Sequence, residues 1–349
     1  MKARFVVATN ELERTEWLRY RKQGIGGSDA GILMGASPWK SRFSLWAEKT
    51  GKVDDEFSGN EATEWGHLLE RTVAEQFARV TGNAVVAYPA MLAHAEHEEL
   101  QANVDFFIVE PNGHTPAGVV TDIEPQSYFD QDGNEWAKGV KPTAILEIKT
   151  TGIATRGNSR EWDEDGVPAT YVYQGAHYAL VTGVHHVVFA ALIGGQGLQI
   201  RERVFTQAVL DNLLREELAF WQTVKTGEEP EAAGADGDFD VLKALYPVSN
   251  EETVQADANV AQAVNEYRLL KSRISELENA AKEARARIEQ YVGNADTLVD
   301  ETGAVLLTYK SNKQTTTLDT KALKADHPEL VAQYTVPKAG ARVLRLKGE

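Results

Sequence analysis

Two predicted strands carry charged residues whose types and spacing suit metal-assisted hydrolysis. Asp105 lies in an apolar run over residues 104–109, and Glu147 and Lys149 lie in a second run over residues 144–149. Residues two apart in a strand face the same side, so we expect Glu147 and Lys149 to project together. Carboxylates from neighbouring strands can hold a hard cation such as Mg²⁺, and the lysine can orient or help to deprotonate an attacking water. The alternative is a solvated strand end, where charged residues are common.

Residues on two predicted helices could complete such a centre. Glu70 lies on a predicted helix over residues 61–81, and without further context it would be a surface glutamate. Gln174 and Tyr178 are four residues apart on a later helix, so they share a face that could hold a nucleotide backbone. Their neighbour His177 is interpreted as a packing histidine rather than a metal ligand.

A glycine-rich turn near the N-terminus is a candidate anion site. Arg21 precedes the segment Gly24-Ile-Gly-Gly-Ser28-Asp29, which is predicted to open a helix. Backbone N–H groups at such a turn can bind a phosphate. The alternative is an ordinary helix cap with Ser28 or Asp29 as the N-cap residue, and the two interpretations are compatible.

The hydrophobic pattern predicts one mixed α/β domain over about the first 225 residues. Helices are expected at residues 11–25, 61–81, 171–182 and 206–226. Strands are expected at residues 84–87, 104–109, 144–149, 186–193 and 198–205, and a hairpin excursion is expected over residues 110–141.

The rest of the chain is predicted to form three segments. Residues 227–252 are rich in acidic side chains and are interpreted as a linker region. Residues 253–294 carry a helical heptad pattern, typical of coiled coils. Residues 295–349 are expected to form a small α+β tail, with two strands around residues 301–303 and a helix near residues 319–333.

The heptad pattern is an apolar seam of about four repeats with alternating spacings of three and four. It consists of Val260, Ala263, Tyr267, Leu270, Ile274, Leu277, Ala281, Ala284, Ile288 and Tyr291. Its alanines suit a helix pressed closely against a neighbour. We therefore expect the helix to fold back within the chain as half of a helical hairpin. The alternatives are a helix docked on the nuclease domain and self-association through the seam.

The composition excludes several classes of protein. The chain has no cysteine, which excludes disulfides, cysteine-rich zinc sites, iron–sulfur clusters and thiol nucleophiles and fits a reducing compartment. No membrane span and no secretory signal are expected from its apolar segments. The net charge of −16 argues against general nucleic-acid binding. However, eight basic against three acidic residues over 14–52, and again over 303–348, leave surfaces that can bind a polyanion.

Several motifs occur in an order that resembles a known family. They are Gly24-Ile-Gly-Gly-Ser-Asp-Ala30, Ser37-Pro-Trp-Lys40, Leu45-Trp-Ala-Glu-Lys-Thr-Gly51, Trp65-Gly-x-x-Leu-Glu70, Asn103-x-Asp105, Leu146-Glu-Ile-Lys-Thr150 and Gln174-x-x-His-Tyr178. The series resembles the YqaJ-like viral recombinases, which belong with lambda exonuclease in the PD-(D/E)XK nuclease superfamily. The resemblance covers about residues 15–225. It implies a nuclease domain over residues 1–226 with a restriction-endonuclease-like core, a central mixed sheet flanked by helices.

The resemblance also implies which residues form the metal centre. Asp105 and Glu147 would be metal ligands, and the backbone carbonyl of Ile148 would add a third oxygen. Lys149 would be the catalytic lysine. Glu70 would assist a metal ion or its waters. The cofactor implied is Mg²⁺, with Mn²⁺ as a substitute.

Further residues are implied to contact DNA. Gln174 and Tyr178 match the Gln-x-x-x-Tyr motif that such nucleases place near DNA, and Arg21 and Ser28 match residues that grip a 5′-phosphate. Arg156 is expected to supply an additional basic contact.

The function implied is a 5′→3′ exonuclease that acts on double-stranded DNA ends and leaves 3′ single strands for a single-strand annealing partner. The family also suggests a homo-oligomer, a ring trimer as in lambda exonuclease, encoded by a phage or prophage and working in the bacterial cytoplasm. The alternatives are an endonuclease or single-strand nuclease on the same core, or a DNA-end-binding or assembly module. The presence of Asp105, Glu147 and Lys149 together counts against a module that only binds.

Overall fold

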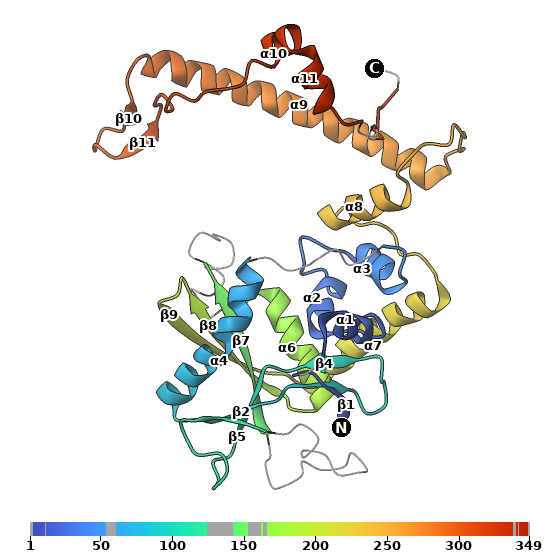
Figure 1. Cartoon of the computed structure of the whole chain (residues 1–349), viewed down its shortest axis with the longest axis vertical. Helices are drawn as coiled ribbons and strands as arrows, with labels where there is room; N and C mark the ends of the chain where they lie inside the picture. The colour runs from blue at the N-terminus through green and yellow to red at the C-terminus, as the bar shows by residue number, and fades with distance from the viewer. Residues whose placement is uncertain are drawn as a thin grey trace. The chain divides into compact units, whose positions relative to one another are not determined.

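The computed structural model describes residues 3–10, 12–53, 61–123, 142–152, 162, 166–337, 340 and 342–347. The chain divides into two compact units, Met1–Tyr246 and Pro247–Glu349 (Figure 1). Within the described residues, no helix is both long enough and apolar enough to cross a membrane.

A six-stranded mixed sheet forms the centre of the first unit. In spatial order its strands are β6 (Val120–Asp122), β2 (Ala84–Ala87), β5 (Phe106–Val109), β7 (Pro142–Thr151), β8 (His186–Ile193) and β9 (Gly197–Val204). β7 is parallel to β8 and β2 is parallel to β6, whereas the other neighbours are antiparallel. Apolar side chains are buried on both faces of the sheet, which explains why its central strands appear in the sequence as nearly continuous apolar runs.

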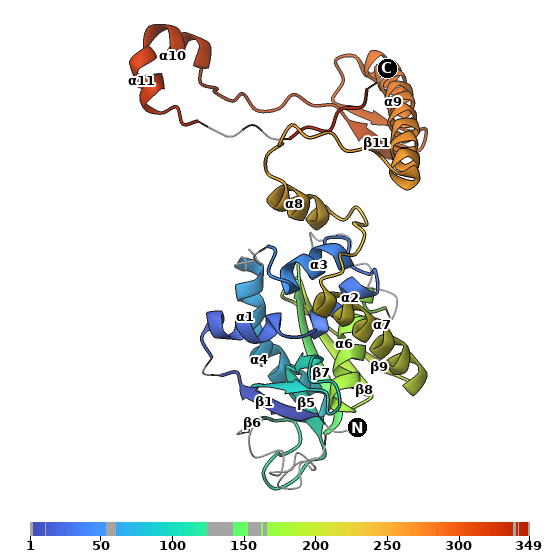
Figure 2. The same cartoon turned by 90° about the vertical axis from the view of Figure 1, so that its right-hand side faces the viewer.

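Helices cover both faces of this sheet, as Figures 1 and 2 show. α4 (Glu61–Thr81) packs on one face, and α6 (Ala169–Thr182) packs on the other face together with α7 (Gln207–Thr226). Gly175 lets α6 approach closely, because a Cβ atom there would lie 2.7 Å from the ring of Phe189 on β8. The predicted architecture, a central mixed sheet flanked by helices, is confirmed.

A smaller antiparallel sheet and three short helices complete the N-terminal part of the first unit. The strands are β1 (Arg4–Ala8), β3 (Ala90–Ala93) and β4 (Gln101–Asn103), and the helices are α1 (Arg14–Lys22), α2 (Gly27–Leu33) and α3 (Arg42–Lys49). The sequence did not predict these strands, because three to five residues with distant partners leave little periodic signal.

The predicted hairpin excursion over residues 110–141 stays a prediction, because only residues 110–123 of it are described. Residues 120–122 form β6, which pairs in parallel with β2. Residues 124–141 lie outside the described residues.

The acidic region after α7 contains one further helix, α8 (Asp236–Leu245), which packs on α3. Ser41 Oγ donates a hydrogen bond of 2.6 Å to Asp238 Oδ1, and the backbone N–H groups of Ala233 and Gly234 donate to Asp238 Oδ2. Asp238 is therefore a buried capping residue rather than one more solvated acidic side chain.

The second unit contains a 35-residue helix, α9 (Ala258–Val292). It is followed by the antiparallel strands β10 (Thr297–Val299) and β11 (Val305–Thr308) and by the helices α10 (Thr320–Asp326) and α11 (Pro328–Gln333). All ten seam residues of α9 are exposed within the second unit, and no other described helix of that unit covers them. The predicted helical hairpin is therefore wrong for the described part of this chain, because no second helix supplies the other half.

Candidate active site

The pairing of β5 with β7 brings the two predicted acidic residues together. Phe106 pairs with Leu146 in this antiparallel ladder, so Asp105, one residue before β5, lies opposite Glu147. The backbone N–H of Ile148 donates a hydrogen bond of 3.0 Å to Asp105 Oδ2. Residues separated by about forty positions in the sequence thus form one carboxylate pair at the centre of the sheet.

Glu147 is the most buried member of the site, with a relative exposure of 1 %. Its Oε1 atom accepts hydrogen bonds from Lys149 Nζ at 2.6 Å and from Gln174 Nε2 at 2.7 Å. Its Oε2 atom is also buried and has no hydrogen-bond partner among the described residues. A buried carboxylate oxygen without a partner is costly, and a bound cation would satisfy it.

Side chains from α6 complete the wall of the site. Gln174 Nε2 also donates to the hydroxyl of Tyr178 at 3.0 Å, so the pair predicted to share a helix face does so in contact with Glu147. Lys149 Nζ lies 4.8 Å from the ring centroid of Tyr171, which is a cation–π contact. The role of Tyr171 was not predicted from the sequence, since an aromatic residue on a helix is usually part of the core.

The carboxyl groups of the site oppose one another's ionisation. Burial, and then the charge of Asp105, raise the pKa of Glu147 to about 8. The same two causes raise the pKa of Glu70 on α4 to about 7, and burial raises the pKa of Asp105. Burial alone would lower the pKa of Lys149, but Glu147 and Asp105 outweigh it and raise that pKa. Lys149 therefore carries positive charge beside these carboxyl groups.

The residues around Glu147 could hold a divalent cation with few carboxylate ligands. Among the described residues, no group of three or more histidine, aspartate or glutamate side chains is placed to hold a metal ion. The expected ligand set is different, because it has only two carboxylates, from Asp105 and Glu147, with the Ile148 carbonyl and a water-mediated contact to Glu70. The unpartnered oxygen of Glu147 and the raised pKa values of Glu147 and Glu70 fit such a set.

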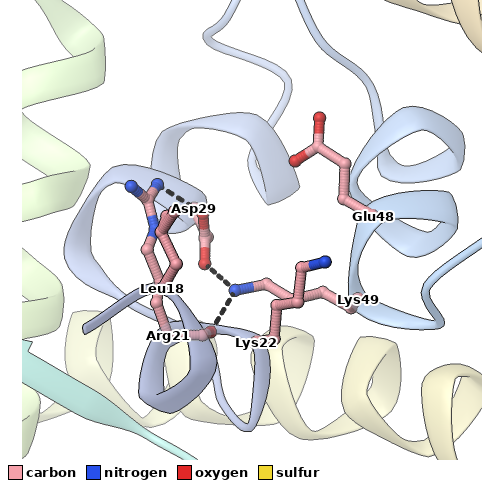
Figure 3. Close-up of a pocket in the computed structure, with 6 residues that line it drawn as sticks. All are labelled: Leu18, Arg21, Lys22, Asp29, Glu48 and Lys49. Atoms are coloured by element: carbon pink, nitrogen blue, oxygen red, sulfur yellow. Dashed lines mark hydrogen bonds and ion pairs between the residues drawn. The ribbon is translucent and has the colours of Figure 1, made fainter. Parts of the chain in front are cut away.

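A pocket with a small net positive charge, called here the cationic pocket, is formed by α1, α2 and α3 (Figure 3). Its charged lining residues are the basic Arg21, Lys22 and Lys49 and the acidic Asp29 and Glu48. Arg21 Nη2 donates a hydrogen bond of 2.8 Å to the hydroxyl of the exposed Ser28, so the two residues predicted to grip a phosphate lie side by side.

A buried ion pair supports this pocket. Lys49 Nζ lies 2.7 Å from Asp29 Oδ2 and also donates to the carbonyl oxygens of Arg21 and Gly24. Figure 3 shows the lysine reaching both the aspartate and the backbone of Arg21. Burial alone would raise the pKa of Asp29, but Lys49 and then Arg21 outweigh it and lower that pKa to about 2. The Asp29–Lys49 pair therefore fixes the position from which the Arg21 side chain extends.

Asp29 also determines how α2 begins. It is the third residue of this helix, and its Oδ2 atom accepts a hydrogen bond of 3.0 Å from the backbone N–H of Gly26. Gly26 is the N-cap residue, so the interpretation of Ser28 or Asp29 as the N-cap is wrong. The carboxylate acts from inside the first turn, which leaves the Ser28 hydroxyl available to Arg21.

His177 and Arg156 are the two remaining residues for which a role was predicted. His177 is fully buried; its two ring nitrogens lie 2.8 Å from Glu217 Oε1 and 2.8 Å from the carbonyl oxygen of Gln101. The interpretation of His177 as a packing histidine is confirmed. Arg156 lies outside the described residues.

Comparisons with known proteins agree with these motifs. Residues 16–185 match the family model of the YqaJ-like viral recombinase domain. The chain is 32% identical to the uncharacterized protein YqaJ of Bacillus subtilis (strain 168) over 334 residues, which cover 94% of this chain and 93% of that protein.

Two solved structures are similar to part of the chain. They are an alkaline exonuclease (LHK-Exo) from Laribacter hongkongensis and LHK-Exo in complex with dAMP, each at 16% identity with a TM-score of 0.45, covering 61% of this chain and 93% of that chain. The match to YqaJ extends over nearly the whole of both chains. The chain therefore belongs to the YqaJ-like viral recombinase family.

Proposed function

We propose that this protein is a Mg²⁺-dependent 5′→3′ exonuclease that degrades one strand from double-stranded DNA ends. The observation that carries the proposal is the cluster of Asp105, Glu147 and Lys149, in which a buried carboxylate oxygen has no partner. A protein that only bound DNA would have no need for this costly arrangement of charges.

In this proposal, Asp105, Glu147 and the Ile148 carbonyl hold the cation. When bound, Mg²⁺, or Mn²⁺ in its place, supplies positive charge that activates water and stabilises the charge developing on the scissile phosphate. Glu70 orients the attacking water with its carboxylate. Lys149 remains protonated, so it adds hydrogen bonds and positive charge at the phosphate.

In this proposal, residues of α1, α2 and α6 hold the DNA end. Gln174 and Tyr178 contact the backbone of the strand beside the carboxylates, and Arg21 and Ser28 bind the 5′-phosphate. A charge-assisted hydrogen bond from an arginine to a phosphate is stronger than a neutral one. The enzyme therefore prefers ends that carry a 5′-phosphate.

The biological role that follows is end resection for recombination. The 3′ single strands left behind would be used by a single-strand annealing partner, in the cytoplasm of a bacterial host that carries the phage or prophage. Membership of the family supports this role, because the family is described as viral recombinases. The remaining 3′ strand is the product that distinguishes the proposal from other nuclease activities.

The test is digestion of a linear duplex labelled at its 5′ or its 3′ end, with a 5′-phosphate or a 5′-hydroxyl, in Mg²⁺ and in EDTA. We expect the 5′ label to be released first as mononucleotide, only with Mg²⁺, while the 3′ label stays on the shortened strand that remains. A covalently closed circular duplex should remain intact. Nicking of the circle would instead identify an endonuclease, and end binding without release of label would identify a binding module.

A further inference from the structure

The most conspicuous apolar surface of the second unit is the seam of α9. Leu270, Ile274 and Leu277, in the middle of the helix, have relative exposures of 54 %, 46 % and 57 %. Isolated exposed apolar residues are common, but a continuous line of them over ten seam positions marks an interaction surface. A helix with this pattern normally buries it against another helix.

The rest of the second unit leaves this seam uncovered. The C-terminal segment reaches α9 where the carbonyl oxygen of Lys347 accepts a hydrogen bond from Arg268, which follows the seam residue Tyr267 and lies beside the seam. Where α9 ends, Val292 is buried, but the neighbouring seam residue Tyr291 is 81 % exposed. The second unit thus covers other parts of α9 and leaves the seam free for a partner.

The positions of large and small residues in the seam identify that partner. If α9 lies antiparallel against α9 of a second copy, with the two-fold axis between residues 275 and 276, the seam forms layers that pair every alanine with a large residue. These pairs are Val260–Tyr291, Ala263–Ile288, Tyr267–Ala284, Leu270–Ala281 and Ile274–Leu277, each formed twice. A parallel arrangement in register would instead place alanine against alanine in three layers and leave poorly packed space there.

The charged residues beside the seam are compatible with the antiparallel arrangement. In this register Glu266 lies near Arg287 of the second copy, and Lys271 lies near Glu278 of the second copy. No like charges face each other among these flanking positions. Arg287, like the other three, is on the exposed surface of α9, so new ion pairs there require no burial of charge.

We propose that α9 is a dimerisation helix that pairs with α9 of a second copy as an antiparallel, two-stranded coiled coil. The contact is isologous, so the same seam serves both copies and each contact joins two chains. In the full-length chain this interface joins two nuclease units through their C-terminal units. It is independent of the proposed nuclease activity.

The first test is the mass of the full-length protein in solution, measured by light scattering. The variant Leu270→Glu places a charge in the seam, and Leu269→Glu is the matched control, since Leu269 is 72 % exposed and lies off the seam. We expect the seam variant to have half the mass of wild type and the control to keep it, with equal helix content by circular dichroism. Equal masses for wild type and Leu270→Glu would overturn the proposal.

The second test determines the relative orientation of the two α9 helices by disulfide cross-linking. The chain has no cysteine, so only the introduced cysteines can react. Leu270→Cys and Ala281→Cys proteins are oxidised separately and as a mixture that has been dissociated and reassociated. We expect cross-linked dimers in the mixture alone, because Leu270 faces Ala281 of the second copy. Cross-linking of the Leu270→Cys protein by itself would indicate a parallel pair, and no cross-linking in any sample would exclude the seam contact; either result overturns the proposal.

Discussion

The backbone of Gly27 lies against the ring of Tyr178. A Cβ atom on Gly27 would come within 2.5 Å of Tyr178 Cε1 and 3.0 Å of Gln174 Cγ. This contact joins α2, which carries Ser28, to the face of α6 that contacts Glu147. The cationic pocket and the carboxylate cluster are therefore positioned by one close helix packing. The distance between the pocket and the cluster therefore depends on Gly27, which has no side chain to hold the two helices apart.

The first prediction follows from this contact. Gly27→Ala should destabilise the protein by about 1–3 kcal/mol, the usual cost of overpacking, because the Tyr178 ring must move. It should also lower nuclease activity, since Gln174 and Tyr178 shift with the ring. Chemical denaturation and digestion of linear duplex measure the two effects. Gly113→Ala is the control, because a Cβ there meets no atom within 4 Å. Equal effects of the two substitutions would contradict the packing argument.

The second prediction concerns the buried Asp29–Lys49 pair. Because the pKa of Asp29 is lowered to about 2 in the folded protein, its contribution to stability is present above the unfolded pKa near 3.8. That contribution, about 2 kcal/mol, is lost as the pH falls from about 5 toward 2. Wild type should therefore lose more unfolding free energy than Asp29→Asn between pH 5 and pH 2.5. Parallel pH dependences for the two proteins would show that Asp29 is not held as described.

The third prediction concerns the 5′ end. Arg21→Ala should reduce the preference for 5′-phosphorylated over 5′-hydroxyl duplex by on the order of 10- to 100-fold, the effect of losing a charge-assisted hydrogen bond. Rates on the two kinds of end measure it directly. Arg19→Ala is the matched control, because Arg19 lies on the same helix and is exposed beside Glu16. A wild-type enzyme that digests both ends at one rate would contradict the pocket's assignment.

The fourth prediction couples metal binding to pH. The raised pKa values of Glu147, about 8, and of Glu70, about 7, mean that protons must leave before a cation can bind. Without metal, the contribution of Glu147 to stability is present below its ordinary pKa and is lost as the pH rises through about 8. The increase in Tm on adding Mg²⁺ should therefore be larger at pH 8.5 than at pH 6.5.

The same measurement on Glu147→Gln serves as the check on this coupling. This variant should show little increase in Tm at either pH, because it lacks the carboxylate that binds the cation. Glu64→Gln changes an exposed glutamate of α4 and should behave as wild type. A Mg²⁺ effect independent of pH in wild type would exclude proton release from these carboxyls.

The parts of the fold that depend on local pattern could be predicted from the sequence. The bounds of α4, β2 and β8 agree with their predicted ranges, because each has an uninterrupted helical stripe or an apolar run bounded by turn residues. The juxtaposition of Glu147 and Lys149 also follows from strand periodicity alone. The opposition of Asp105 to Glu147 needed the pairing register, which the spacing of the motifs could suggest but not fix.

What could not be predicted depends on contacts between distant residues. Lys49 lies on α3 and Asp29 on α2, and only the packing of these helices brings them to 2.7 Å. Asp238 binds Ser41, 197 residues away, so its structural role is hidden in a segment whose composition resembles a linker. The seam of α9 was visible in the sequence, but whether the chain supplied its partner depended on the presence of a second helix.

The central claim is that the carboxylate pair of Asp105 and Glu147 is the centre of nuclease activity. The most direct measurement is the release of acid-soluble nucleotide from a linear 5′-phosphorylated duplex in Mg²⁺ by wild type, Asp105→Asn, Glu147→Gln and the control Glu64→Gln. We predict that wild type and the control digest the duplex at similar rates and that both site variants, although folded and able to bind DNA ends, release about 1000-fold less, as expected when an electrostatic contribution of roughly 4 kcal/mol is lost. Digestion by either site variant at a rate close to that of wild type would contradict the claim.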